Sequence, residues 1–191
     1  MPIVDLSALA GKLAELPPSC GPVRVVAVDG PSGAGKSTFA RRLGAVLEAP
    51  VVGSDQFRVP WESESPLVWW EPFAEQVLAP LAAGRAGGFR PFSWRRGGYR
   101  DWLEIPVTPV LIVEGVGAAW RESPAAYRIW LDAPRKLRRA RVIGRDGGEL
   151  GPQWDRWSDR ETAHFAADRT AERADLRIDG VSGAVIGERL P

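Results

Sequence analysis

The residues best suited to chemistry form a glycine-rich run near the start of the sequence. Residues 30–37 read Gly-Pro-Ser-Gly-Ala-Gly-Lys-Ser and match the pattern G-x-x-x-x-G-K-S. Glycines let such a loop curl until its backbone N–H groups converge on an anion. Lys36 would neutralise the β- and γ-phosphates of ATP, and Ser37 would ligate Mg²⁺. We therefore expect ATP and Mg²⁺ as cofactors, with nucleotide contacts from Gly30, Ser32, Gly33, Ala34, Gly35, Lys36, Ser37 and Thr38.

The sequence on either side of this loop supports a phosphate site. The β-branched run 23–28 predicts a strand before the loop, and residues 37–47 predict a helix after it. That order favours a phosphate-binding loop over a glycine-rich turn that fits the pattern by chance. Asp29, between the strand and the loop, either lies near the metal or caps the turn. No N-K-x-D motif and no apolar run ending in Asp-Glu occur, which disfavours a switch GTPase or a motor ATPase.

Two acidic residues follow predicted strands and should meet at one edge of a sheet. Glu114 comes directly after the apolar run 110–113, and Asp55 follows the short run 51–52. Ligands of open α/β folds bind at the carboxyl ends of the strands. Asp55 would accept or orient the proton of an acceptor hydroxyl, whereas a turn-capping Asp is the alternative. We assign the metal to Ser37, Glu114 and Asp55, with a surface carboxylate as the alternative for Glu114.

A run of arginines lies downstream on a predicted helix over 135–146. Arg138, Arg141 and Arg145 are spaced i, i+3 and i+7, so they share one face of that helix. A row of arginines that faces the phosphates would stabilise charge on the transferring group. The alternative is a solvated basic face paired with acidic side chains.

The least typical part of the sequence is the insert at about 57–108, which is rich in Trp, Gly and Pro. It contains a helical pattern at 71–83. The segments 89–94 and 99–105 flank Arg-Arg-Gly-Gly at 95–98, which predicts a hairpin. We interpret the insert as an acceptor-binding flap.

The aromatic side chains of the insert allow two interpretations. They either pack in a core, or they offer flat surfaces beside arginines on which a planar group of the acceptor stacks. The cluster consists of Trp61, Trp69, Trp70, Phe92, Trp94, Tyr99 and Trp102. We assign candidate acceptor contacts to Phe57, Trp69, Trp70, Phe92, Trp94 and Arg96.

Length and periodicity indicate the fold class. A chain of 191 residues fits one domain. Apolar runs that alternate with helical patterns predict a three-layer α/β fold, in which helices cover both faces of a mainly parallel sheet of about five strands. We expect a single domain over 1–191 with a lid region at about 135–160. Further elements are predicted as helices at 5–16 and 152–174 and strands at 127–131 and 176–178.

Composition limits the partners. Lys plus Arg (25) nearly balance Asp plus Glu (24), which argues against nucleic acid and anionic membranes as partners. A single cysteine excludes an internal disulfide, and no apolar run reaches the ~18–20 residues that span a bilayer. We expect a cytoplasmic protein with a small-molecule acceptor. The oligomeric state stays open, with a homodimer as one option.

Taken in order, these segments resemble the uridine kinase and phosphoribulokinase group of P-loop kinases, including the short nucleoside/nucleotide kinase-like ATP-binding proteins. Residues 30–38 correspond to the phosphate loop, 54–57 (Ser-Asp-Gln-Phe) resemble the family's D-S-F-Y segment, 111–115 resemble its h-h-x-E-G segment, and 131–146 resemble its lid helix. The resemblance implies the P-loop NTPase fold, Asp55 as the base, Glu114 at the magnesium site, and Arg141 and Arg145 as catalytic lid residues beside Lys36.

By this resemblance the protein would transfer the γ-phosphate of ATP to a hydroxyl of a small molecule, with a nucleoside as the first expectation. The hairpin at 91–97 lacks the Tyr, Asp and His with which uridine kinases read a pyrimidine. Residues 28–33 also resemble bacterial cytidylate kinase, so a nucleoside monophosphate or another small metabolite is an alternative acceptor. An ATP-binding regulator without catalytic activity is the alternative from another functional class.

Overall fold

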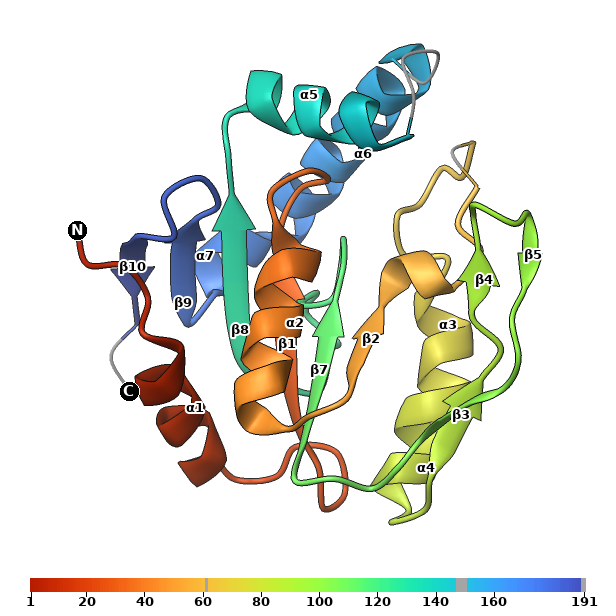
Figure 1. Cartoon of the computed structure of the whole chain (residues 1–191), viewed down its shortest axis with the longest axis vertical. Coiled ribbons are helices and arrows are strands. Elements are labelled where there is room, and N and C mark those ends of the chain that lie inside the picture. The colour runs from red at the N-terminus through yellow and green to blue at the C-terminus, as the bar shows by residue number, and fades with distance from the viewer. Residues whose placement is uncertain (61, 147–150, 190–191) are drawn as a thin grey trace.

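The computed structural model describes residues 1–60, 62–146 and 151–189, and a six-stranded sheet lies at its centre (Figure 1). Five strands are parallel, and the sixth pairs antiparallel at one edge. This confirms the predicted α/β fold with a mainly parallel sheet. In spatial order the strands are β10 (Val185–Glu188), β9 (Leu176–Asp179), β8 (Ala125–Asp132), β1 (Arg24–Asp29), β7 (Val110–Glu114) and β2 (Val51–Gly53).

The edge strand β10 was not predicted. Its side chains alternate between partly buried and exposed, and Gly187 adds no side chain to the pattern. An edge strand that buries little apolar surface leaves a weak sequence signal, because the signal depends on burial. It therefore adds a sixth strand to the five that the apolar runs indicated.

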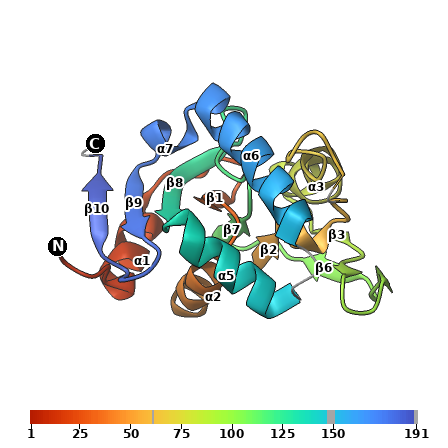
Figure 2. The same ribbon diagram turned by 90° about the horizontal axis from the view of Figure 1, so that it is seen from above.

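Helices cover both faces of the sheet and form three layers (Figure 2). Successive residues of a strand point to opposite faces. From β1, Val26 and Val28 pack against α1 (Leu6–Glu15) and α2 (Lys36–Leu47), while Val25 and Ala27 join the core on the other face. The helices that follow β8 are α5 (Arg135–Asp146), α6 (Gly151–Asp168) and α7 (Thr170–Arg173).

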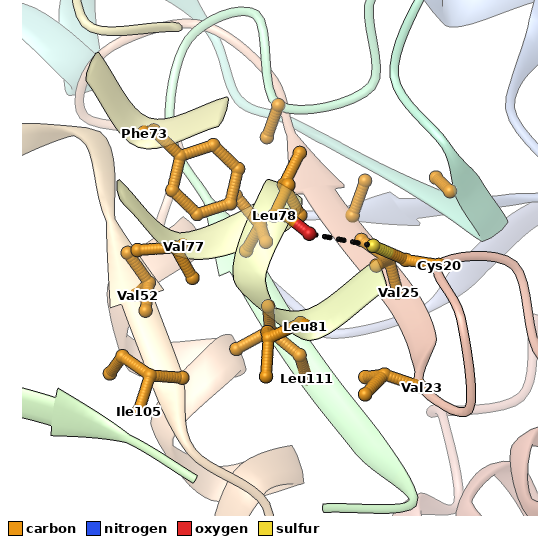
Figure 3. Packing of buried hydrophobic residues seen from close by; sticks show 14 of the residues in the cluster. Cys20, Val23, Val25, Val52, Phe73, Val77, Leu78, Leu81, Ile105 and Leu111 are labelled. Atoms are coloured by element: carbon orange, nitrogen blue, oxygen red, sulfur yellow. Dashed lines mark hydrogen bonds between the residues drawn. The ribbon is translucent and has the colours of Figure 1, made fainter. Parts of the chain in front are cut away.

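The core on the face of Val25 and Ala27 packs the helical part of the insert against the sheet (Figure 3). Phe73, Val77 and Leu81 project from one side of the insert and are fully buried. The thiol of Cys20 donates to the carbonyl of Leu78 at 3.4 Å and closes the edge of this cluster. Burial of this face fixes the helical part of the insert to the sheet. The residues of the insert near the carboxyl ends of the strands are therefore attached to a packed core.

The helix predicted at 71–83 is one continuous helical segment with a π-helical turn in its middle. It consists of α3 (Trp70–Phe73), the π-helical turn Ala74–Leu78 and α4 (Ala79–Ala82). Pro80 lacks the N–H that an α-helix would donate to residue 76, and the N–H of Ala79 donates instead to Ala74, five residues back. The proline therefore marks the place where the regular pattern changes.

The predicted hairpin is present as two short antiparallel pairs. β3 (Gly87–Phe89) pairs with β6 (Leu103–Ile105), and β4 (Phe92–Ser93) pairs with β5 (Gly98–Tyr99). Gly97 adopts a positive φ of 65°, as the turn signal required. The helix predicted at 152–174 is divided into α6 and α7 at Arg169, whose φ is 56°.

No helix in the described ranges combines the length and apolar character needed to cross a bilayer.

Candidate active site

The glycine loop joins β1 to α2, and its backbone requires glycine at several positions. Gly30, Gly33 and Gly35 have φ values of +138°, +82° and +106°, which side chains rarely allow. A Cβ at Gly30 would lie 1.9 Å from the carbonyl oxygen of Leu131, and one at Gly33 would lie 2.6 Å from that of Arg138. The loop therefore packs tightly against the end of β8 and the start of α5. It leads into the N-terminus of α2, where unpaired N–H groups attract anions.

Lys36 is the first residue of α2 and is largely buried. Its Nζ donates to the carbonyl of Pro31 at 3.1 Å, which holds the ammonium group over the loop. Burial raises the pKa values of three nearby carboxyl groups, those of Asp29, Glu114 and Glu161, and the positive charge of Lys36 opposes each rise. Lys36 therefore lies where the acidic groups of the site converge.

Two carboxylates and a hydroxyl meet beside Lys36. β2 and β7 pair with Gly53 opposite Glu114, and Asp55 follows in the 3₁₀ turn Ser54–Gln56. Burial raises the pKa of Glu114, and the charge of Asp55 raises it further, whereas Lys36 and a hydrogen bond from Ser37 lower it. The parallel strands therefore bring together the three predicted metal ligands.

The donor set suits Mg²⁺, which prefers oxygen ligands and keeps several waters or phosphate oxygens. Two nearby carboxylates also repel each other unless a cation lies between them. Within the described ranges, no group of three or more His, Cys, Asp or Glu side chains is placed to hold a metal ion. Ser37, Glu114 and Asp55 could therefore hold Mg²⁺ only if nucleotide or water oxygens completed the coordination shell.

Asp29 caps the turn that follows β7. Its carboxylate is fully buried and accepts hydrogen bonds from the N–H groups of Gly30, Gly117 and Ala119 at 2.7, 3.0 and 2.8 Å. Burial raises the pKa of Asp29 to about 6, and these bonds oppose the rise. Of the two interpretations of Asp29, the structure supports the turn cap.

The three arginines on the predicted lid helix differ in what they contact. Arg141 donates to the carbonyls of Gly33 and Gly180 at 3.1 and 3.2 Å, so it connects the loop to the β9–β10 turn. Arg141 and Arg145 both line the cavity beside the glycine loop. Arg138 is buried and forms an ion pair with Glu161 at 3.2 Å. Arg138 therefore does not share the exposed position of Arg141, although the spacing placed both on one face.

The ion pair of Arg138 belongs to a network that surrounds Ser32 of the glycine loop. Glu161, on α6, is fully buried and accepts from the N–H of Ser32 at 3.0 Å. Arg138 donates to the Ser32 carbonyl at 3.3 Å, and Nε1 of Trp157 donates to the Ser32 hydroxyl at 3.0 Å. All three polar groups of Ser32 are thus held by α5 and α6. Seen from above, these helices lie across the carboxyl end of the sheet (Figure 2).

Sequence reasoning missed Glu161 and the contact of Trp157 with the loop. A signal was present, because Glu161 lies four residues after Trp157 and seven after Trp154 and therefore shares their helix face. A carboxylate on a buried aromatic face needs partners. Those partners are Arg138 and the N–H of Ser32 in the loop.

These groups surround a cavity of about 890 Å³, near the upper end of the ~300–1,000 Å³ usual for small-molecule sites. Its wall includes most of the predicted loop residues, and Gly30 and Ala34 do not line it. Predicted site residues on the wall are Ser32, Gly33, Gly35, Lys36, Ser37, Thr38, Asp55, Glu114, Arg141, Arg145, Trp69 and Trp94.

The predicted acceptor contacts separate into two groups. Trp69 and Trp94 line the cavity. Phe57 is buried and stacks on Phe89 at a centroid distance of 4.6 Å, and Trp70 packs edge-on against Trp120. Phe92 packs against Trp94 and Tyr99, Arg96 is exposed at the hairpin turn, and Trp61 lies outside the described residues. Position therefore favours packing for Phe57, Trp70 and Phe92, and also for Trp69, which borders the cavity but is only 1% exposed.

Comparison with known proteins supports the fold. A protein from Silicibacter sp. TM1040 described as a candidate fructose transport system kinase is 24% identical, with a TM-score of 0.64 over 90% of this chain and 95% of that one. A possible uridine kinase from Bacillus stearothermophilus is 15% identical, with a TM-score of 0.62 over 90% of this chain and 96% of that one. The chain therefore has a P-loop kinase-like fold. No protein-family model matches the sequence, and the curated proteins give no significant match.

Proposed function

We propose that the protein is a phosphotransferase that moves the γ-phosphate of ATP to a hydroxyl of a small molecule, with nucleosides as the first acceptors to test. The observation that carries the proposal is that Lys36 and Asp55 line the same cavity. An ATP-binding regulator would need the glycine loop but not an aspartate beside it. The kinase descriptions of the two structural neighbours agree with this proposal.

In the proposed reaction, each residue has one role. The loop N–H groups and Lys36 hold the phosphates, and Ser37 and Glu114 hold Mg²⁺, which neutralises phosphate charge when bound. Asp55 takes the proton of the acceptor hydroxyl as its oxygen bonds to the γ-phosphorus and the bond to the β–γ bridging oxygen breaks. Arg141 and Arg145 offset the charge that develops on the transferred group. The hairpin that carries Trp94 is bonded to the backbone carbonyl of Asp55 and would limit access of water once the acceptor is bound.

The decisive test is release of ADP that depends on an acceptor. The Asp55→Asn variant should lose about a hundredfold or more in turnover and keep its affinity for Mg·ATP, because Asp55 acts on the acceptor. Glu62→Gln, an exposed carboxylate of the insert, serves as the matched control. Unchanged turnover in Asp55→Asn would remove Asp55 from the proposal. Binding of Mg·ATP without product from any acceptor would favour the regulator.

A kinase of this kind requires ATP, and Cys20 is a free thiol; both suit the cytoplasm, where we propose that the protein acts.

A further inference from the structure

The cavity has two chemically different halves. The half under α5 carries Lys36, Arg41, Arg141 and Arg145 beside the glycine loop. The other half is lined by the 3₁₀ turn, the hairpin and the residues at the end of β7, and it combines apolar side chains with Asp55, Glu114 and Arg95. Its lining residues are Ser54, Asp55, Val59, Pro66, Trp69, Trp94, Arg95, Glu114, Gly115 and Val116. In the proposed function, this second half receives the acceptor.

Both tryptophans of the acceptor half have already used their hydrogen-bond donors. Nε1 of Trp69 donates to the carbonyl of Val116 at 3.0 Å, and Nε1 of Trp94 donates to the carbonyl of Asp55 at 2.8 Å. Trp69 is only 1% exposed and packs beneath the wall, so Trp94, which is 47% exposed, is the ring that offers apolar surface to a ligand. The bond from Trp94 also fixes the hairpin turn beside Asp55, so the next residue, Arg95, is held at the cavity.

Arg95 is the cation that the hairpin contributes to the described cavity wall, and its side chain is exposed. Within the described part of the chain, no carboxylate forms an ion pair with it. A guanidinium group is planar and donates two parallel hydrogen bonds to a carboxylate or a phosphate. An arginine on the cavity wall that no described carboxylate neutralises suits a ligand that brings the anion.

A neutral nucleoside fits this half less well. The edge of a base needs both donors and acceptors, and among the described residues of this wall there is no Asn, Gln, His or Tyr side chain. Buried polar atoms of a base would lack partners and reduce its affinity. A ligand with its polarity at two ends and an apolar middle matches the wall better.

We propose that the acceptor is a small hydroxyl compound with an anionic group, a carboxylate or a phosphate ester, which binds Arg95 while its hydroxyl reaches Asp55. This inference rests on the proposed kinase function and names the class of acceptor. Trp94 and Val59, which have accessible surface at the wall, contact the carbon skeleton between the two ends. The anion places a negative charge near the γ-phosphate, and Arg95 neutralises it.

The experiment uses matched pairs of acceptors that differ in the anionic group. The pairs are glycerol with glycerate and with glycerol 3-phosphate, fructose with fructose 6-phosphate, and uridine with uridine 5′-monophosphate. Products are identified by mass spectrometry in the presence of Mg·ATP. The glycerol set separates carboxylate from phosphate recognition. Arg95→Gln is compared with Arg100→Gln, which changes an exposed arginine of the same hairpin.

We expect product from one or more anionic members and a KM for that acceptor that rises about tenfold to a hundredfold in Arg95→Gln. Its kcat and the affinity for Mg·ATP should change little, because Arg95 binds ground state and transition state alike. Arg100→Gln should match the unmodified protein. Arg95→Gln should not alter the KM of a neutral acceptor.

Two results would overturn the inference: preference for the neutral member of each pair, or an unchanged KM for the anionic acceptor in Arg95→Gln. Both leave a working kinase. No product from the whole panel, or failure to bind Mg·ATP, would instead refute the proposed kinase function itself, so the two failures are distinguishable.

Discussion

Replacement of Arg138 by glutamine should weaken the binding of Mg·ATP, although Arg138 is turned away from the cavity wall. The change leaves the fully buried carboxylate of Glu161 without its ion-pair partner. That carboxylate is one hydrogen bond from the glycine loop, at 3.0 Å from the N–H of Ser32. A negative charge at this place repels the phosphates that the loop would hold. Arg138 forms the ion pair that offsets it, and the charge of Lys36 adds to that effect.

The size of the effect follows from the charges and their separation. One unit charge about 8 Å from a phosphate charge, at an effective dielectric constant of about 20, changes the energy by about 2 kcal/mol, or about thirtyfold in Kd. Loss of one partner of a buried pair also costs about 3–5 kcal/mol of folding free energy. For a chain of 191 residues, that lowers Tm by about 6–20 °C.

The reverse change should have the opposite effect on the nucleotide. In Glu161→Gln the amide oxygen still accepts from Ser32, but the positive charge of Arg138 is no longer balanced, so Kd for Mg·ATP should fall. The double variant removes both charges and should return Kd to near its original value. Burial raises the pKa of Glu161, and loss of Arg138 raises it further. The weakening in Arg138→Gln should therefore grow as pH rises and the carboxylate ionises.

Isothermal titration with Mg·ATP, at temperatures below the lowered Tm, measures these constants, and circular dichroism confirms that each variant is folded. A purely structural role would weaken binding in both single variants. If Arg138→Gln and Glu161→Gln shift Kd in the same direction by similar factors, the electrostatic argument is wrong.

Further predictions concern Asp29, Trp94 and Gly180. Because burial raises the pKa of Asp29 from 3.8 to about 6, the folded protein holds this proton more tightly, so its contribution of up to about 3 kcal/mol is present at pH 4 and lost as pH rises through about 6. Denaturant titrations should show this fall in the free energy of unfolding with pH in the unmodified protein and not in Asp29→Asn. The same change of unfolding free energy with pH in both proteins would contradict the prediction. Trp94→Phe removes the donor to Asp55 and should raise acceptor KM several-fold, whereas an equal loss of Mg·ATP affinity would argue against that role. Gly180→Ala would place a Cβ 2.0 Å from the carbonyl oxygen of Ala34 and should lower Tm, and an unchanged Tm would show that the turn can move.

The sequence predicted best what short patterns and burial determine. The strand, loop and helix around Lys36 were identified from consecutive residues, because the backbone of the loop needs glycine at fixed positions. The pairing of β2 with β7 brought Asp55 near Glu114, as expected for parallel strands that end at one edge.

Contacts between residues that are far apart in the sequence could not be predicted from residue spacing. Helical periodicity placed Arg138 and Arg141 on one face, but it could not show that Glu161, 23 residues later, pairs with Arg138. The same limit applies to the insert. Its composition indicated aromatic surfaces, yet only tertiary packing decides that Phe57 lies in the core while Trp94 reaches the cavity.

The close packing of the main chain around the loop limits how this sequence can diverge. A Cβ at Gly30, Gly33 or Gly180 would collide with a carbonyl oxygen of Leu131, Arg138 or Ala34. Because the obstructing atoms belong to the backbone, no substitution of a neighbouring side chain can relieve the collision. Most other positions can drift, which is consistent with folds shared at 24% and 15% identity. Searches for remote relatives would gain from requiring, besides the loop pattern, a glycine directly after the strand that ends at Asp179.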